Sequence, residues 1–394
     1  MPEPLVSLER CDRYDLAEVT SAVKRALAPF GGMAAFVRPG MRVALKPNLI
    51  MPRHPDEAAT THPILVEAVA RMAVELGAAV VIADSPGGAH CERNLRRIYD
   101  GCGMTAAAAR SGATLNFDLG ETTVHLPQGA RLKSMNVLKP LATADLVINL
   151  PKLKSHGQMV YTGAVKNLFG AIAGIMKGEY HLRLANYDHF ANALIDVFLA
   201  VSPRLTIMDA IMAMEGEGPT AGKPRPLRFL MAGTDAFAMD LVATDLIGLK
   251  PGEVPMLRQS MVRELCPASV KNIRLAGADP ARLRVADFDL PGRRHLQPIE
   301  FFDKGILRWA ANTFLRPRPV VNRSLCTGCR DCERHCPAKV IHFEGKYPLI
   351  DLKGCIRCFC CQELCPAKAL KIVHPPGHKF MRDHVAPIAA KLLS

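Results

Sequence analysis

The residues best suited to chemistry in this chain are its cysteines, because nine of the 13 fall between residues 326 and 365. Eight of these nine form two runs of identical spacing, and each run ends in Cys-Pro. The runs are Cys326-x2-Cys329-x2-Cys332-x3-Cys336-Pro337 and Cys355-x2-Cys358-x2-Cys361-x3-Cys365-Pro366. The chain is long, and its N-terminal residues lack the basic stretch and apolar core of an export signal, so a disulfide scaffold is not expected. Clustered thiols of this kind indicate metal binding.

The spacing of both runs resembles the pattern of bacterial ferredoxins, in which the fourth cysteine of one run binds the cluster of the other. This resemblance implies two 4Fe-4S clusters. One would be held by Cys326, Cys329, Cys332 and Cys365, and the other by Cys355, Cys358, Cys361 and Cys336. Structural zinc bound by four cysteines is the weaker alternative, because both runs are complete and end in Cys-Pro. Cys360 would break the spacing, and we predict that it is not a ligand.

The cysteine-rich module is basic, with nine Lys/Arg and five Asp/Glu between Asn322 and His374. Bacterial ferredoxins are usually acidic carriers. We therefore interpret this module as a relay, fused to a larger domain, that exchanges electrons with an acidic ferredoxin or flavodoxin. A module of this size cannot hold a core unaided, so we expect cluster binding to supply much of its folding energy.

The rest of the chain, residues 1–300, reads as an α/β domain. Short apolar segments predict strands at 41–46, 78–83, 146–150, 204–208 and 228–232, and apolar periodicity predicts helices at 64–76, 162–175, 189–201 and 236–247. Thr61 is the expected cap of the first of these helices, and Gly77 its stop. Strand, helix and strand in this order imply right-handed crossovers between parallel strands. We expect a layered, mostly parallel sheet with helices on both faces.

Polar segments follow four of these strands, and ligands of open α/β sheets bind at the edge where parallel strands end. We therefore expect one crevice there, lined by Lys46, Asn48, Asp84, Lys152, Lys154, His156, Lys166, Asn167 and Asp209. The lysines suit a phosphate or carboxylate group, and a helix starting at Thr162-Gly163 would add backbone amides. His156 would act as the acid/base group, since histidine titrates near neutral pH, and Lys166 would anchor an anionic substrate.

Each of these residues also has a structural interpretation. A loop lysine is often only a solvated charge, His156 has even odds of being a structural hydrogen-bonding group, and Asp235 is most simply a helix cap. Carboxylates could alternatively bind a divalent cation, the candidates being Asp209, Glu215, Asp235 and Asp240. The segment contains no G-x-G-x-x-G or P-loop lysine pattern. A flavin or a divalent metal in this domain therefore stays open.

These segments resemble the family catalogued as domain of unknown function 362. The resemblance covers roughly residues 40–250. It rests on Lys46-Pro47-Asn48, Lys154-Ser155-His156, the segment from Thr162 to Gly170 with sequence TGAVKNLFG, Gly233-Thr234-Asp235, and Asp240. Members often carry a two-cluster ferredoxin module at the C-terminal end, as here. The resemblance implies an architecture but no settled reaction.

The composition sets wider limits. With 394 residues, 49% hydrophobic and 22% charged, the chain has ample material for a globular core. No apolar run reaches the roughly 18 to 20 residues of a spanning helix, and the clustered thiols predict a cytoplasmic location. We expect the α/β domain at 1–300, a linker helix within 301–320, a small α+β ferredoxin-type domain at 321–374 and a tail at 375–394.

Three functions are compatible with these features. The first is an iron–sulfur oxidoreductase that passes electrons through two 4Fe-4S clusters to or from a small anionic substrate in the crevice. The second is a non-catalytic electron-transfer protein or an assembly protein for a cofactor or metal centre. The net charge of +13 suggests nucleic acid as a third, but aromatic residues make up only 6% and there is one Trp for base stacking. A closed pocket facing a cluster would favour the first.

Overall fold

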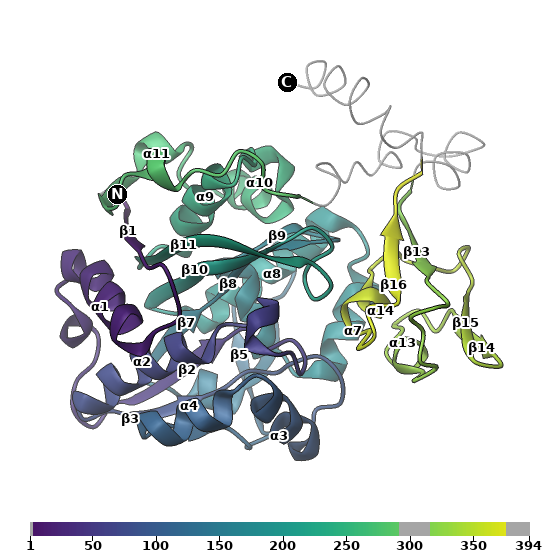
Figure 1. Cartoon of the computed structure of the whole chain (residues 1–394), viewed down its shortest axis with the longest axis horizontal. Helices are drawn as coiled ribbons and strands as arrows, with labels where there is room; N and C mark the ends of the chain where they lie inside the picture. The colour runs from purple at the N-terminus through teal and green to yellow at the C-terminus, as the bar shows by residue number, and fades with distance from the viewer. Residues whose placement is uncertain (1–2, 291–315, 376–394) are drawn as a thin grey trace.

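The computed structural model describes residues 3–290 and 316–375. A large α/β domain lies beside a small cysteine-rich module (Figure 1). The predicted linker helix at 301–315 and nearly all of the predicted tail lie outside the described residues, and the domain boundaries stay a prediction. No helix in the described part of the chain has the length and apolar character needed to cross a membrane.

The α/β domain is built on a ten-stranded mixed sheet with the order β12-β1-β11-β10-β7-β2-β3-β4, and with β8 and β9 attached beside β10. The strands are β1 (Leu5–Arg10), β2 (Arg42–Pro47), β3 (Ala79–Ile82), β4 (Thr114–Leu115), β7 (Leu146–Leu150), β8 (Lys152–His156), β9 (Val160–Thr162), β10 (Leu205–Glu215), β11 (Lys223–Gly233) and β12 (Arg274–Gly277). Strands β10, β7, β2, β3 and β4 run parallel, whereas β11 is antiparallel to both of its neighbours.

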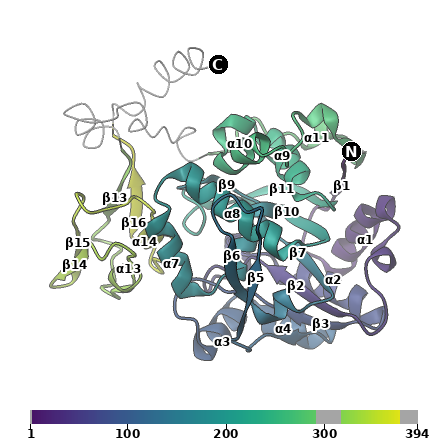
Figure 2. The same cartoon turned by 180° about the vertical axis from the view of Figure 1, so that it is seen from behind.

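Helices cover both faces of this sheet. One face carries α1 (Leu16–Leu27), α2 (Pro63–Glu75), α3 (Glu92–Gly101) and α4 (Met104–Ser111). The other carries α5 (Lys139–Ala142), α6 (Ala164–Asn167), α8 (Tyr187–Val201), α9 (Ala236–Leu246), α10 (Pro255–Val262) and α11 (Pro280–Leu283). A further helix, α7 (Gly174–Arg183), lies at the side nearest the small module (Figure 2). The mostly parallel, two-faced α/β architecture expected from the sequence is confirmed.

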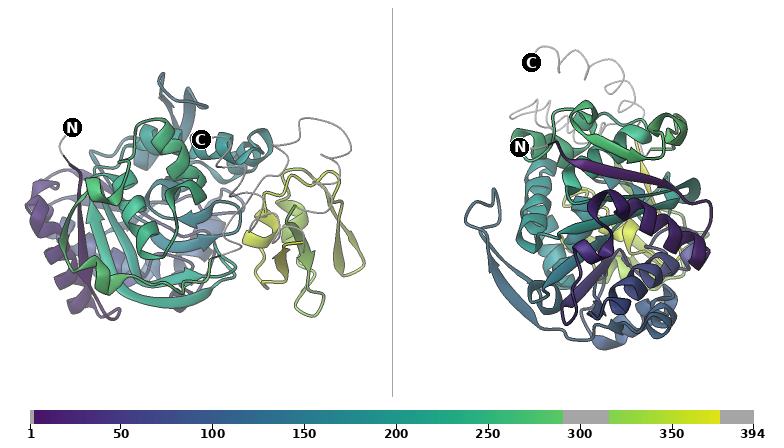
Figure 3. Two further views of the ribbon diagram at one scale, coloured as in Figure 1. Left: turned by 90° about the horizontal axis from the view of Figure 1, so that it is seen from above. Right: turned by 90° about the vertical axis from the view of Figure 1, so that its left-hand side faces the viewer.

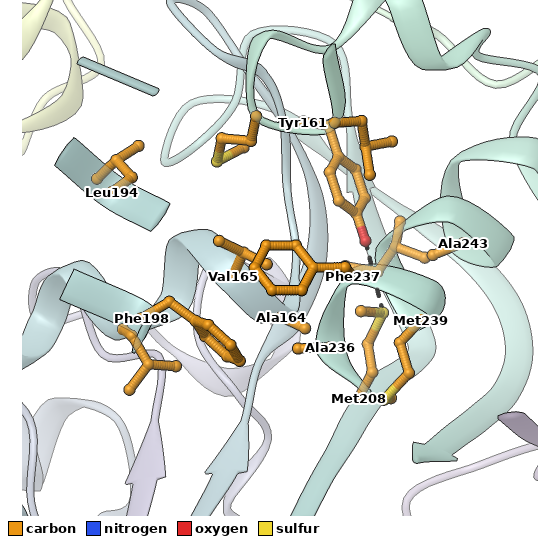
Figure 4. Close-up of a cluster of buried hydrophobic side chains, with 14 of the residues drawn as sticks. Tyr161, Ala164, Val165, Leu194, Phe198, Met208, Ala236, Phe237, Met239 and Ala243 are labelled. Atoms are coloured by element: carbon orange, nitrogen blue, oxygen red, sulfur yellow. Dashed lines mark hydrogen bonds between the residues drawn. The ribbon is translucent and has the colours of Figure 1, made fainter. Parts of the chain in front are cut away.

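Alternate residues along the central strands enter two separate cores. In β2, Val43 and Leu45 pack beneath α1 and α2, whereas Ala44 packs into the opposite core. A period of two is expected for a sheet that is covered on both faces, and it makes each strand read as a continuous apolar run. In the second core, Phe198 of α8 and Phe237 of α9 meet edge to face with ring centroids 5.2 Å apart (Figure 4).

The predicted strands correspond to β2, β3, β7, β10 and β11, but three local predictions are wrong. Residues 152–157 do not form a loop, because 152–156 are the buried strand β8. The helix expected at 162–175 is broken into α6, a 3₁₀ turn at Leu168–Ala171 and the start of α7. His62, and not Thr61, caps α2 through its side chain, since the Thr61 hydroxyl donates to the Leu150 carbonyl at 2.6 Å.

Two other parts of the domain had no sequence-based prediction. The weakly patterned segment after residue 249 supplies α10, α11 and the edge strand β12, which runs parallel to β1. A hairpin of β5 (Glu121–His125) and β6 (Ser134–Leu138) projects from the domain (Figure 3). Neither part lines the cavity described below.

The small module is built from two short antiparallel strand pairs and two one-turn helices. Its elements are β13 (Arg318–Val321), α13 (Asp331–Arg334), β14 (Ile341–Glu344), β15 (Tyr347–Ile350), α14 (Cys360–Glu363) and β16 (Leu370–Val373). Four of the seven residues in its buried core are cysteines. So small an apolar core agrees with the expectation that cluster binding stabilises the module.

Candidate functional site

The two cysteine runs fold into two copies of the same turn. Positive φ angles occur at equivalent positions of both runs, at Gly328 and Arg357, and again at Arg330 and Phe359. These left-handed residues turn the chain sharply between successive cysteines, so that the thiols of one run face a common space. The sequence repeat is therefore also a repeat of backbone conformation.

The cysteines surround two small cavities of about 20 Å³ each. The first is lined by Cys326, Cys329, Cys332 and Cys365, and the second by Cys336, Cys355, Cys358 and Cys361. Within residues 3–290 and 316–375, no three or more His, Cys, Asp or Glu side chains are arranged to hold a single metal ion. Four thiols around a shared space suit a 4Fe-4S cluster better than one tetrahedral zinc, whose donors must converge to about 2.3 Å.

A much larger cavity of about 620 Å³, here called the interface cavity, lies between the α/β domain and the small module. The α/β side of its wall consists of the segments that follow β2 and β3, together with α6 and α7. The module side includes Cys336 and Glu363. A volume in the range of 300–1,000 Å³ is typical of a small-molecule site. The chain therefore places a ligand-sized cavity against one of the proposed cluster ligands.

Polar contacts between described residues hold the two sides of the interface cavity together. The Nε2 of His156 lies 3.2 Å from Oε1 of Glu363, and Lys368 pairs with Glu57 at 2.8 Å. The remaining contacts involve backbone carbonyls: Arg53 donates to Cys365 and Pro366, Gln362 donates to Glu217, and the Thr220 hydroxyl donates to Glu363. The module is thus fixed by polar contacts that surround the proposed clusters.

Lys46 and Asp84 form a balanced ion pair in the wall of the interface cavity. Nζ of Lys46 lies 2.6 Å from Oδ1 of Asp84, and the other carboxylate oxygen accepts from the Leu49 amide at 2.9 Å. Gly170 permits this approach, because a Cβ there would lie 2.0 Å from Asp84 Oδ1. Burial lowers the pKa of Lys46 and the adjacent carboxylate opposes that shift. The ion pair therefore forms part of the cavity wall without adding net charge to it.

Lys166 and Lys177 differ from Lys46 because no carboxylate lies within ion-pair distance of either amino group among the described residues. Lys177 instead donates to the carbonyl of Ser85. Burial lowers the pKa of Lys166, and it lowers the pKa of Lys177 to about 8. Lys166 and Lys177 are therefore partly buried cations of the interface cavity that no carboxylate contacts among the described residues, whereas Lys339 of the same lining is exposed.

Asn48 and Asn167 connect the wall of the interface cavity to the sheet. The Asn48 amide donates to Asn167 Oδ1 at 3.0 Å, and Asn167 donates to the Lys46 carbonyl at 3.0 Å. Lys154 is not part of the cavity lining, but it donates to Asn48 Oδ1 at 2.7 Å. Burial lowers the pKa of Lys154 to about 7. Both asparagines line the predicted crevice, whereas Lys154 supports it from behind.

His156 lies at the domain contact and not in the cavity lining. Its Nδ1 accepts from the backbone amides of Gln158 and Met159, at 3.1 and 3.2 Å. Nε2 therefore carries the proton and faces Glu363. Both ring nitrogens are engaged, so the geometry favours a positioning role. The prediction that His156 faces the crevice is wrong, because the segment that carries it is a buried strand and not an open loop.

Lys152 and Asp209 also lie outside the interface cavity, in a second cluster in which both of these side chains are fully buried. Asp209 accepts from Lys152 Nζ at 2.9 Å, from the Tyr14 hydroxyl at 2.7 Å and from the His62 amide at 2.9 Å. The rings of Tyr14 and His62 stack with centroids 3.6 Å apart. The prediction that these two residues share the crevice is wrong, because each satisfies the other.

The alternative divalent-cation site is not formed among the described residues. Asp235 caps α9 by accepting from the amides of Phe237 and Ala238, which confirms the simpler interpretation of that residue. Asp240 accepts from the amides of Ala164 and Val165, so the start of α6 is already occupied and cannot bind an external anion. These carboxylates support the packing of helices and do not meet at one point.

The predicted crevice did not include several residues that line the interface cavity, among them three on its α/β side. Lys177 and His181 lie on α7, which follows the break at Gly170 and Gly174, and Ser85 follows β3. The apolar pattern that predicted one helix to residue 175 concealed this second helix. A pair of glycines five residues or fewer apart inside a helical pattern is the signal that could have exposed it.

Comparison with known proteins agrees with both parts of the chain. Residues 43–245 match the family model described as Domain of unknown function (DUF362), and residues 318–366 match one described as 4Fe-4S dicluster domain. A thylakoid-associated protein of Synechocystis sp. is 34% identical over 311 residues, which is 78% of this chain and 93% of that protein. These matches identify the same two segments that the residues indicated.

Two solved structures are distantly similar. The lactate racemase apoprotein from Thermoanaerobacterium thermosaccharolyticum has 14% identity and a TM-score of 0.34, and the match covers 59% of this chain and 54% of that one. A protein from Thermotoga maritima has 12% identity and a TM-score of 0.34, covering 65% of this chain and 60% of that one. The chain thus spans little more than half of the length of either structure.

Proposed function

Because the chain belongs to the DUF362 family and joins that domain to a 4Fe-4S dicluster domain, we propose that this iron–sulfur protein is an oxidoreductase. Its substrate would be a small anion bound in the interface cavity. Each electron gained or lost by the substrate is balanced by the opposite change in an external carrier.

One observation carries this proposal: Cys336 and Lys166 line the same 620 Å³ cavity. Cys336 would hold one 4Fe-4S cluster together with Cys355, Cys358 and Cys361, and the remaining four cysteines of the runs would hold a second. The clusters would supply one-electron transfer between carrier and substrate. A ligand-sized cavity beside a proposed cluster ligand is what distinguishes this function from that of an electron carrier alone.

The protein's own residues would bind and orient the substrate. Lys166 would anchor its anionic group, and the partial burial of this lysine strengthens such a contact because less water screens it. His156 would act as a positioning residue that holds Glu363, and with it the helix α14, against the α/β domain. This role replaces the acid/base role suggested by the sequence, since neither ring nitrogen faces the cavity.

The partner we propose is an acidic electron carrier that docks beside the first set of cysteines. Cys329 is exposed there, and Arg330 lies over the ring of Phe343 at 4.9 Å, next to the same small cavity. Arg323 and Lys346 flank Tyr347 on the adjacent strand. A cationic surface around an exposed cluster ligand would attract a carrier of opposite charge and speed its association. The cytoplasmic location likewise stays a prediction.

Reoxidation kinetics test the proposed function. Protein purified anaerobically is reduced, mixed with carboxylated or phosphorylated metabolites, and followed by its visible absorption. We expect a substrate to reoxidise the wild type, and Lys166→Gln to raise the substrate concentration needed while leaving the iron content unchanged. Lys24→Gln, an exposed change on α1, is the matched control. Reoxidation by an acidic ferredoxin but by no metabolite would instead support a carrier function.

A further inference from the structure

The two unbalanced lysines of the interface cavity lie near each other. The charge of Lys166 contributes to the lowered pKa of Lys177, so their mutual repulsion is part of the electrostatics of the cavity. Lys46 is neutralised by Asp84. Glu363 contacts His156 and opposes the lowering of the pKa of Lys166, but it does not lie within ion-pair distance of either lysine. A partly buried ammonium with no carboxylate in contact is costly, so each of the two amino groups favours direct contact with an anionic group of a ligand.

Two further side chains in the same wall lack hydrogen-bond partners among the described residues. Ser85 is 2% exposed and His181 is 7% exposed, yet Oγ of the serine and Nδ1 of the histidine are unpaired. Burial, reinforced by Lys166 and Lys177, lowers the pKa of His181 to about 3, so this imidazole is neutral and adds no third cation. Buried polar atoms are normally satisfied, which indicates that a ligand completes these two.

The wall also contains apolar side chains. Phe169, Leu182 and Leu364 line the interface cavity together with Pro337. Phe169 is held edge to face by Phe190, with ring centroids 5.5 Å apart, and is therefore a fixed surface. A ligand that is only an inorganic ion would leave these side chains against water, whereas a carbon skeleton would cover them.

We propose that the interface cavity binds a small organic dianion, whose charges pair with Lys166 and Lys177 while Ser85 and His181 donate or accept hydrogen bonds and Phe169 packs on its carbon skeleton. A dicarboxylate and a phosphate monoester share this chemistry. The inference rests on the proposed function in that it names the substrate class of the same site.

Binding of matched ligands to the anaerobically purified protein tests this inference. Succinate and butyrate have the same number of carbon atoms and differ by one carboxylate, and glycerol 2-phosphate provides the phosphate arm. By calorimetric titration we expect at least one dianion to bind on the order of 10-fold more tightly than butyrate, the usual effect of one added charged hydrogen bond. Tighter binding of succinate or of glycerol 2-phosphate identifies which anionic group the cavity prefers.

Variants of the two lysines test whether the preference for dianions depends on Lys166 and Lys177. Lys166→Gln and Lys177→Gln should each weaken dianion binding on the order of 10-fold and reduce the preference over butyrate, whereas Lys24→Gln should change neither. Iron content and melting temperature show whether each variant is folded. Equal affinity for butyrate and both dianions, or unchanged affinity in both variants, would overturn the proposal.

The redox assay separates this inference from the proposed function. A dianion that binds through both lysines but never reoxidises the reduced protein contradicts the oxidoreductase and leaves the ligand class standing. Reoxidation by a monocarboxylate, with no selective binding of dianions, contradicts the ligand class and leaves the oxidoreductase standing.

Discussion

The α/β domain contains two clusters of buried or partly buried lysines, and the clusters differ in whether the lysine charges are balanced. In the closed cluster, Lys152 and Asp209 are both fully buried and each has several hydrogen bonds. In the interface cavity, Lys166 and Lys177 have no paired acid among the described residues. Burial of a lysine therefore does not identify a binding residue. A buried lysine that already has an acidic partner stabilises the fold, whereas one without such a partner is a candidate for binding a ligand.

The largest effect should come from breaking the closed cluster. Asp209→Ala leaves Lys152 buried without a counter-ion and removes acceptors from Tyr14 and His62. Removing one partner of a buried pair typically lowers the free energy of unfolding by about 3–5 kcal/mol. Lys166→Gln breaks no ion pair and should change it by less than about 1 kcal/mol. Anaerobic urea unfolding of both variants measures the contrast, and equal destabilisation would contradict it.

The next effect concerns the pH dependence of the closed cluster. Burial, opposed by Asp209 and reinforced by Lys152, lowers the pKa of His62 from 6.5 to about 4. The unfolded state therefore takes up the proton first, and the contribution of His62 to stability is lost as the pH falls from about 6.5 towards 4 and changes no further below that. A shift of this size corresponds to about 3 kcal/mol.

His62→Asn is the matched variant for this measurement. Asparagine can still accept from the Ile64 amide at the start of α2, but it does not titrate. Its free energy of unfolding should vary less between pH 6.5 and 4 than that of the wild type. Parallel curves for the two proteins would show that His62 is not the titrating group.

The difference between the clusters also explains how much of the molecule could be predicted from sequence. The cysteine ligands are spaced locally and buried parallel strands read as apolar runs, so the cysteine module and β2, β3 and β7 were predicted. Strand β8 has a polar sequence and is nevertheless buried. Its lysines can be buried because Asp209 pairs with Lys152 and Asn48 accepts from Lys154, and these partners are 57 and 106 residues away. The sequence pattern within a single strand contains no information on partners at that separation.

The interface cavity was predicted only in part for the same reason. Lys46, Asp84 and Lys166 lie in or directly after predicted elements, and the structure brings them together in one wall. His181 and Glu363 come from a helix concealed by glycines and from the other module. Their contribution depends on how two separate parts of the chain dock, which composition and periodicity do not encode.

A smaller effect is expected on ligand binding in the interface cavity when Glu363 is replaced. Glu363 is the acid whose charge acts most strongly on the amino group of Lys166. Glu363→Gln removes that charge and keeps an acceptor for His156, so succinate should bind more tightly, by roughly 2- to 5-fold. Glu75→Gln, an exposed change at the end of α2, is the control. Weaker binding of succinate to Glu363→Gln would mean that the carboxylate helps to hold the ligand.

The smallest expected effect is that of replacing Cys360. This residue lines the interface cavity and is not one of the proposed cluster ligands. Cys360 and Cys361 are successive residues of α14, so their side chains point about 100° apart. Cys361 lines the small cavity with Cys336, whereas Cys360 lines the interface cavity. Cys360→Ser should therefore leave the iron and sulfide content unchanged, and Cys361→Ser should lose much of one cluster. Iron analysis of the two anaerobic proteins compares them directly. Equal iron loss in both variants would make Cys360 a ligand and would remove it from the wall that receives the substrate.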